Sequence, residues 1–237
     1  MVKAEKALKI AVDLHIHSAL SPCAHDDMTP NNIVNMAILK GLDAIAITDH
    51  NSCDNVRAAM MVAGSRLVIL PGMEVQSREE AHLLCYFADL AALDEFDSVV
   101  RHCLHAPANE PGRFGRQLII NDQDEVIGER NELLISSIGL SLDEIVGEVR
   151  RLNGVVVPAH VDRPSYSILS QLGFIPPELA FNMLELSKNS ARISSHDSKT
   201  SYIFSSDAHC LEDILERESF LLVDDLSVHS IIKSMSK

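Results

Sequence analysis

The residues of this chain with the clearest chemical potential are histidines and carboxylates that recur in short clusters. The chain has 11 histidines among 237 residues, and several stand beside an acidic residue. In chain order the clusters are Asp13-Leu14-His15-Ile16-His17, Asp49-His50, Glu74, His160 and Asp207-Ala208-His209. Neutral imidazole and carboxylate together suit Zn, Mn or Fe. The pattern therefore predicts a metal centre. The sequence contains neither a nucleophile elbow nor a P-loop motif, which argues against an acyl-transfer triad and against NTP hydrolysis through a P-loop.

The spacing within the clusters indicates how metal ions are held. Alternate residues of a strand point to the same side, so His15 and His17 can reach one ion. A carboxylate such as Glu74 can bridge two ions, and two ions about 3.5–4 Å apart can clamp a phosphoryl group and lower the pKa of a bridging water. Five histidines and three carboxylates exceed the needs of one mononuclear site.

The elements predicted around these clusters alternate between strand and helix. Apolar runs predict strands at 9–16, 43–48, 67–75, 81–88, 154–159, 183–187, 202–205 and 220–223. Helices are predicted from Thr29-Pro30 to Gly41 and at 54–63, 91–104, 142–152 and 227–235. Residues 105–135 break the alternation and are expected to form a small insertion with a hairpin. The pattern favours one α/β domain over 1–237, a (β/α) barrel or a relative of one.

Each cluster directly follows a predicted strand. The carboxyl ends of barrel strands open onto one mouth, so we expect the five segments to converge on a single pocket. One Asp-x-His-x-His match can occur by chance, and a lone buried histidine is usually a core residue. The prediction therefore rests on five segments at five strand ends.

The composition limits the partners. The formal net charge is −14, and an acidic chain repels phosphate backbones, so we expect no broad binding of nucleic acid. Five cysteines without a C-x-x-C pair, and no signal-like N-terminus, predict a reduced cytoplasmic protein. No apolar stretch approaches the ~18 residues that span a bilayer, so no membrane association is expected.

The ordered motifs resemble those of a known family. Asp13-Leu14-His15-Ile16-His17-Ser18, Ile47-Thr48-Asp49-His50-Asn51, Gly72-Met73-Glu74-Val75, Pro158-Ala159-His160 and Ser206-Asp207-Ala208-His209 are similar to successive motifs of the PHP (polymerase and histidinol phosphatase) family. The resemblance runs from about residue 9 to 224 and is strongest to stand-alone bacterial phosphoesterases. It implies a distorted (β/α)7 TIM-like barrel, two or three divalent ions (Zn, Mn or Fe) and phosphoester hydrolysis.

The resemblance also implies a ligand set. A first ion would be held by His15, His17, Glu74 and Asp207. Glu74 would bridge to a second ion, completed by His82 and His160. A third ion would use His50 and His209 with one ligand from the loop 21–27, where His25 is our choice and Asp26 and Cys23 are alternatives.

The expected function is metal-dependent hydrolysis of a phosphoric ester by a metal-activated hydroxide. The expected partner is a small-molecule phosphate ester, either a small organic phosphate or a nucleotide. His50, His209 and Asp207 are the predicted catalytic residues, and one of the two histidines could protonate the leaving oxygen. Arg163 and Lys188 are predicted to bind the phosphate. Asp13 and Asp49 are expected to orient neighbouring imidazoles. The alternative functions are a histidinol phosphatase and a non-catalytic metal-binding regulatory module.

Overall fold

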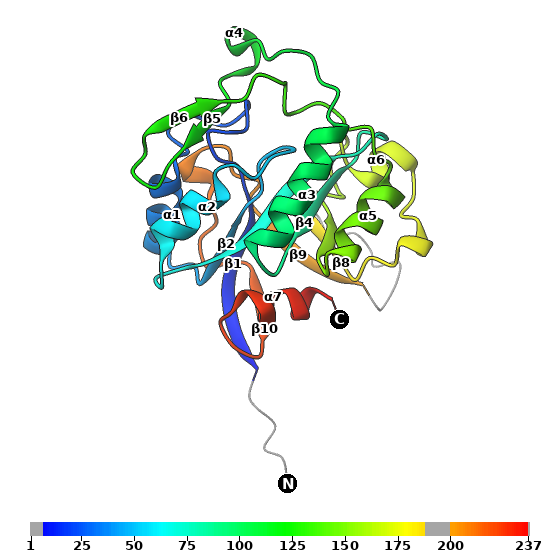
Figure 1. Cartoon of the computed structure of the whole chain (residues 1–237). Helices are drawn as coiled ribbons and strands as arrows, with labels where there is room; N and C mark the ends of the chain where they lie inside the picture. The colour runs from blue at the N-terminus through cyan, green and yellow to red at the C-terminus, as the bar shows by residue number, and fades with distance from the viewer. Residues whose placement is uncertain (1–6, 188–199, 237) are drawn as a thin grey trace.

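The computed structural model describes residues 7–187 and 200–236 (Figure 1). Its central feature is a mixed six-stranded sheet in the order β10-β1-β2-β3-β4-β7. These strands are β1 (Leu8–Ile16), β2 (Ala44–Ile47), β3 (Val68–Gln76), β4 (His82–Tyr86), β7 (Val155–Pro158) and β10 (Phe220–Val223). β1, β2 and β3 are parallel, whereas β4 and β10 run antiparallel to their neighbours. The α/β class is therefore confirmed, and the expected count of seven β/α units is not.

A second, two-stranded parallel sheet, β8 (Met183–Ser187) and β9 (Ser201–Ser205), continues the curl of the first. At one seam the Val161 N–H donates to the Glu185 carbonyl (2.9 Å), and the Glu185 carboxylate accepts the His160 N–H (2.9 Å). At the other seam the Asp13 carboxylate accepts the Ser206 N–H (3.0 Å). At both seams between the two sheets, buried carboxylates therefore accept backbone N–H groups, as carbonyls do within a sheet.

Five helices pack against the sheet where the apolar spacing predicts them. They are α1 (Pro30–Leu39), α2 (Val56–Ala63), α3 (Leu90–Cys103), α5 (Leu142–Arg151) and α7 (Val228–Met235), the last of which lies at one end of the curl of the sheet (Figure 1). The Thr29 hydroxyl caps α1, and Ser141 and Glu144 form a capping box on α5. Four short turns were not predicted: α4 (Pro111–Phe114), α6 (Ile168–Leu172) and the 3-10 helices η1 (Pro177–Leu179) and η2 (Leu211–Asp213). Within the described residues no helix is long and apolar enough to cross a membrane.

Alternate residues of the strands divide the core into an outer and an inner part. The outer part lies between the sheet and its helices and includes Ile45, Ile47 and Phe96. The inner part fills the curl of the sheet, where the Tyr86 hydroxyl donates to the Leu14 carbonyl (2.7 Å). Gly72 allows this packing, since a Cβ there would lie 3.0 Å from the Tyr86 ring. β3 continues as one strand through Pro71-Gly72.

The predicted insertion lies over one end of the sheet (Figure 1, green, top), opposite the end where β10 and α7 lie. It contains α4 and the antiparallel hairpin of β5 (Leu118–Ile120) and β6 (Val126–Glu129). The buried Asn55 amide donates to the Leu118 carbonyl (3.0 Å) and to the Ser18 hydroxyl (2.9 Å), and its oxygen accepts the Ile120 N–H (2.9 Å). One side chain therefore joins the hairpin to the loop after β1.

We expect Asn55→Ala to lower the free energy of unfolding by about 1–3 kcal/mol, because buried polar partners lose their hydrogen bonds. Urea denaturation measures this change. Asn32→Ala is the matched control: its exposed amide donates to the Asp27 carbonyl (2.9 Å), and its effect should stay within about 0.5 kcal/mol. Equal effects of the two substitutions would contradict the anchoring role of Asn55.

Candidate metal centre

The centre of the site is the carboxylate of Glu74, which is 1% exposed at the end of β3. Five imidazoles from four other segments surround it. The distances from its oxygens are 2.8 Å to His82 Nδ1, 2.9 Å to His50 Nδ1, 3.3 Å to His15 Nε2, 3.4 Å to His160 Nε2 and 3.5 Å to His17 Nε2. Strands β1 and β4 and the segments after β2 and β7 supply these rings. The predicted convergence of strand ends is present.

Asp207, which follows β9, forms a second acidic point beside Glu74. Its Oδ1 lies 3.2 Å from His15 Nε2 and 3.0 Å from His17 Nε2. Three sets of residues each offer ligand atoms that lie within 4.8 Å of one another. The sets are His15–His17–Asp207, His50–Glu74–His82 and His17–His50–His209. The site can therefore offer donors for more than one ion.

Hydrogen-bond acceptors set the orientation of three imidazoles. His15 Nδ1 lies 3.0 Å from Glu185 Oε2, and His82 Nε2 lies 3.1 Å from Gln76 Oε1. His209 Nδ1 lies 2.8 Å from the Asp207 carbonyl. Each partner is an acceptor, so it holds the proton on that nitrogen and leaves the other nitrogen of the ring free to bind a metal.

His17 is oriented through a relay of two side chains. The Ser21 hydroxyl donates to Asp49 Oδ1 (2.7 Å) and lies 2.9 Å from His17 Nδ1. Because its own proton goes to Asp49, the hydroxyl accepts from His17, and His17 Nε2 keeps its lone pair. Asp49 thus orients an imidazole as expected, but through Ser21. Asp13 does not act in this way: its oxygens accept the backbone N–H groups of Ser206 (3.0 Å) and Leu215 (2.9 Å).

Two of the predicted ligands sit on left-handed backbone. The φ angle is 28° at His160 and 52° at Asp207. Such a conformation costs a non-glycine residue about 1–3 kcal/mol and persists where the surrounding contacts over-determine it. The turn at each residue takes the chain out of the strand and directs the side chain to the cluster.

Burial and neighbouring charge act on the cluster in opposite directions. Burial alone would raise the pKa of Glu74, but the charges of His82, His15 and His50 hold it well below its usual range. Burial would lower the pKa of His15, but Glu185, Asp207 and Glu74 raise it well above the ordinary value. Burial lowers the pKa of His17, and the charges of His209 and His50 lower it further. The carboxylates stay ionised, and the imidazoles cannot all be protonated together.

The residues present fit divalent cations. His15 Nε2 and His17 Nε2 face each other at 3.1 Å, although the opposite nitrogen of each ring is already engaged. His50 Nδ1 and Glu74 Oε2 are buried and form no hydrogen bond, although they lie 2.9 Å apart. Buried polar atoms that lack a hydrogen-bond partner are costly. Cations bound beside these two pairs of atoms would give each atom a partner.

The structure brings most of the predicted ligands together. The four residues expected around a first ion and the three expected around a second all meet at Glu74 and Asp207. His50 was expected at a third ion, and its Nδ1 lies 2.9 Å from Glu74 Oε2. Glu185, Gln76 and Ser21 were missed; the one available signal was a charged residue, Glu185, within the apolar run Met183–Ser187.

The choice of His25 in the loop 21–27 is corrected. Its side chain is 73% exposed and lies 3.9 Å from Asp27, while Asp26 is also exposed. Cys23 is exposed as well, but it lines the cavity that also contains His50 and His209. Partial desolvation would raise the pKa of its thiol, but hydrogen bonds from His209 and His50 lower the pKa to about 6.

The two predicted phosphate-binding residues have different outcomes. Arg163 lies at the rim of the cluster, where its guanidinium pairs with the Asp207 carboxylate. Lys188 lies outside the described residues.

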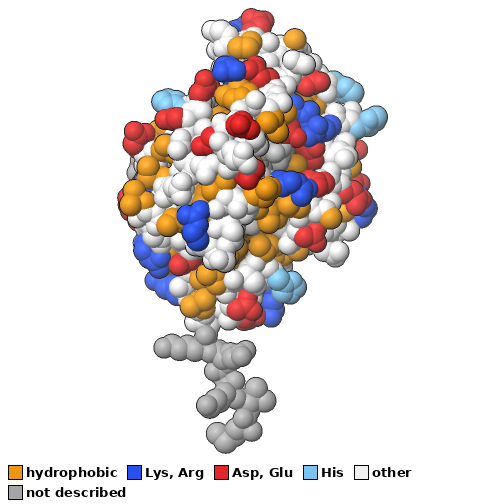
Figure 2. Space-filling view, turned by 60° about the vertical axis from the view of Figure 1, so that its left-hand side comes forward, with side chains coloured by type: hydrophobic (Ala, Val, Ile, Leu, Met, Phe, Trp, Pro, Cys, Tyr) orange, Lys and Arg blue, Asp and Glu red, His pale blue; other side chains and the backbone are white. Residues whose placement is uncertain are grey.

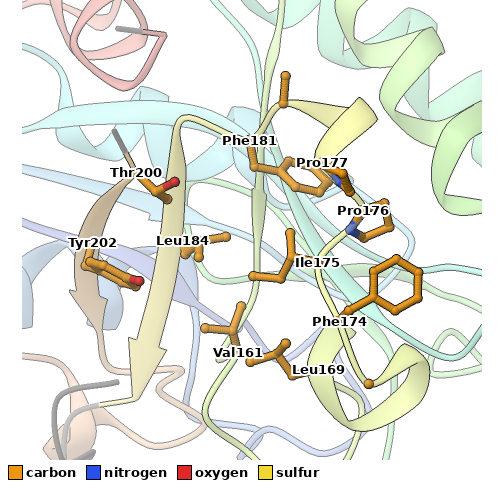
Figure 3. Close-up of a pocket in the computed structure, with 12 residues that line it drawn as sticks. Val161, Leu169, Phe174, Ile175, Pro176, Pro177, Phe181, Leu184, Thr200 and Tyr202 are labelled. Atoms are coloured by element: carbon orange, nitrogen blue, oxygen red, sulfur yellow. The ribbon is translucent and has the colours of Figure 1, made fainter. Parts of the chain in front are cut away.

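A cavity of about 250 Å³ opens onto the cluster and is lined by Cys23, His50, Glu74, Gln76, His82, Ile135, His160, Arg163, Ser165, Tyr166, Asp207 and His209. A larger cavity of about 530 Å³ lies between β8, β9 and residues 161–181 (Figure 3). Its wall is mostly apolar, with Phe174, Phe181 and Leu184 prominent, and none of its lining residues is a histidine, cysteine or carboxylate. The reactive groups therefore belong to the smaller cavity.

Comparisons with known proteins follow the same motifs. A family model described as the PHP domain matches residues 13–164. An uncharacterized protein of Methanocaldococcus jannaschii, MJ0043, is 25% identical over 163 residues, which is 69% of this chain and 18% of that protein. A Bifidobacterium adolescentis protein assigned as a metal-dependent phosphoesterase has a TM-score of 0.57 at 17% identity, covering 86% of this chain and 89% of the other.

Endonuclease Q also shares the fold. The lesion-specific endonuclease from Pyrococcus furiosus has a TM-score of 0.72 at 21% identity, covering 96% of this chain and 56% of that one. An Endonuclease Q complex with a 27-mer duplex that carries an abasic lesion has a TM-score of 0.73 at 22% identity, covering 97% and 57%. This chain therefore spans little more than half of the length of Endonuclease Q.

This likeness corrects the expected partners. A small-molecule phosphate ester and an absence of broad nucleic-acid binding were predicted, yet the fold is shared with an enzyme solved on a DNA duplex. The prediction took a net charge of −14 as a property of the whole surface. Figure 2 shows basic side chains interspersed with acidic ones on the visible face, so the net charge does not describe every part of the surface.

We expect Glu185→Gln to weaken metal binding by about 10- to 100-fold, because His15 loses the carboxylate that orients it. Competition with a chromogenic zinc chelator measures the affinity. Glu178→Gln, at an exposed position on η1, is the matched control and should bind as the wild type does. Wild-type affinity in Glu185→Gln would show that His15 needs no orienting partner.

Proposed function

This chain belongs to the PHP domain family, and from that premise we propose that it is a metal-dependent phosphodiesterase that cleaves nucleic acid. The observation that carries the proposal is the buried carboxylate of Glu74, which has a ring nitrogen of each of five imidazoles within 3.5 Å. The likeness to Endonuclease Q supports nucleic acid as the substrate class.

His15, His17, Glu74 and Asp207 would hold a first ion, and Glu74, His82 and His160 a second. Ions bound there would lower the pKa of a water molecule and neutralise charge on the phosphoryl oxygens. The chain's own part is to fix the donors: Glu185, Gln76 and Ser21 keep the rings in place, so that little reorganisation is needed when the phosphate arrives.

Cys23, His50 and His209 would hold a third ion. His17 also offers a ligand atom within 4.8 Å of those of His50 and His209. Its free nitrogen already faces His15 and Asp207, however, so we do not assign it to this ion. His209 has one nitrogen engaged with the Asp207 carbonyl, so the other can bind either an ion or a proton. We assign His50 and His209 to ion binding rather than to protonation of the leaving oxygen, and Zn suits the site because thiolate is a soft ligand.

Arg163 is the protein's own positive charge beside the phosphate. Its guanidinium pairs with Asp207 at the rim, and its side chain is 37% exposed. An ion on Asp207 would compete for the same carboxylate and leave the guanidinium fork available for a phosphate oxygen.

Removal of metal should abolish hydrolysis of bis-p-nitrophenyl phosphate and of a single-stranded oligodeoxynucleotide, and added Mn or Zn should restore it. Glu74→Gln should lower kcat/KM by more than about 100-fold, because even the loss of an orienting partner costs 10- to 100-fold. Metal analysis accompanies each assay.

Glu80→Gln serves as the control, since Glu80 is exposed in the turn between β3 and β4. Activity that survives chelation, or that survives in Glu74→Gln, would contradict the proposal. A metal-loaded protein that cleaves neither substrate would identify a binding module instead.

In the metal-free protein, alkylation of Cys23 by iodoacetamide should rise with pH through a midpoint at about 6, because the thiolate is the reactive form. Peptide mass spectrometry follows the labelling. Cys210 is the internal control: its hydrogen bond with Asp213 raises the pKa to about 11, so it should stay unlabelled at pH 7. Zn should protect Cys23; equal labelling with and without Zn would remove Cys23 from the third site.

A further inference from the structure

Tyr166 stands at the mouth of the metal cavity and has no part in the proposed metal chemistry. It lies between β7 and α6 and is 47% exposed. The other two tyrosines are elsewhere: Tyr86 is buried in the inner core, and Tyr202 lines the apolar cavity of Figure 3. Tyr166 is thus the tyrosine placed to meet a substrate at the metals.

Two contacts hold Tyr166 against a metal ligand. Its ring stacks on the His82 imidazole, with the centroids 5.1 Å apart and the planes 20° from parallel. Its carbonyl accepts the His82 N–H (2.8 Å). Its φ is 55°, a conformation that is costly for an aromatic residue and that clusters at functional sites. One face of the ring is covered by His82, and the exposed surface remains for a ligand.

We propose that Tyr166 is the stacking platform for an unpaired nucleobase next to the cleaved phosphate. This inference rests on the proposed function and narrows its substrate to single-stranded or extruded nucleotides. A base has an aromatic face that stacks on tyrosine whatever its sequence. Ile135 from the insertion lines the same cavity. Ile135 and Tyr166 therefore add apolar surface from two segments to a cavity whose floor is formed by the polar metal ligands.

The size of the cavity supports an unpaired base. At about 250 Å³ it is of the scale of one small ligand, which suits a phosphate with one base. A base in a duplex has both faces stacked and must leave the helix to reach such a platform.

The proposal is tested by removing the Tyr166 ring, the nucleobase, or both. The metal-loaded protein and its Tyr166→Ala, Tyr166→Phe and Tyr166→Leu variants are assayed on oligothymidylate and on the same strand with an abasic residue at the cleaved position. Tyr166→Ala and Tyr166→Leu should raise KM on oligothymidylate by about 5- to 150-fold, the range for loss of one stacked base. Tyr166→Phe should match the wild type, and all variants should match on the abasic strand.

Phe174→Ala, which removes an aromatic side chain that is 56% exposed, should change nothing. Metal content is measured in each variant, because loss of the ring could disturb His82. An equal loss on both strands would assign Tyr166 to positioning of His82, and no loss on either would remove it from the site; each outcome overturns the inference while the proposed function stands.

A binding assay separates the two proposals if the wild type cleaves neither strand. A single-stranded oligonucleotide that carries 2-aminopurine should lose fluorescence on the wild type and on Tyr166→Phe, but not on Tyr166→Ala. Quenching without cleavage would contradict the proposed function and keep the platform. Quenching that is equal in all variants, or absent from the wild type, would overturn the platform.

Discussion

The buried carboxylate of Glu74 is the group on which the site depends. An ion of this kind is tolerated in a protein interior only where charges and donors surround it. Here the surroundings are imidazoles, and they compete: the pKa of His15 is raised, whereas those of His17 and His82 are lowered by burial. Protons alone cannot satisfy every nitrogen at once. Divalent ions can, which is why the cluster makes physical sense as a metal centre.

Holding that cluster constrains the backbone. Its ligands come from strand ends that are far apart in the chain, so the sheet must curl until β9 lies beside β1. The carboxylates of Asp13 and Glu185 act at the two seams. Glu185 accepts the His160 N–H and also orients His15, so the same side chain joins the sheets and fixes a ligand. Fold and metal geometry are therefore coupled at this residue.

The mouth of the metal cavity and its floor are built from different parts of the chain. Strand ends place the metal ligands, whereas loops from three segments supply Cys23, Ile135, Arg163 and Tyr166. Buried amides hold these loops down; the Asn51 amide, for example, donates to the carbonyls of Leu134 (2.6 Å) and Ser136 (2.7 Å). Substrate choice can then differ between proteins that share the floor, which is consistent with a common fold among enzymes of different length and substrate.

The sequence by itself determined the strands and most of the cluster. Strand periodicity is local, so β8 and β10 have the predicted bounds, and ligands that follow a strand directly have little freedom in where they go. Tertiary structure decided the rest. The direction of β4 is set by its antiparallel pairing with β3. The Glu185 carboxylate contacts His15, which is 170 residues away in the chain. In the loop after β1, Cys23 lies at the cluster where His25 was expected. This loop packs closely on Gly115, where a Cβ would lie 2.0 Å from the carbonyl oxygen of Pro22. Loop direction and strand pairing depend on contacts between distant segments, and such contacts leave no periodic signal in the chain.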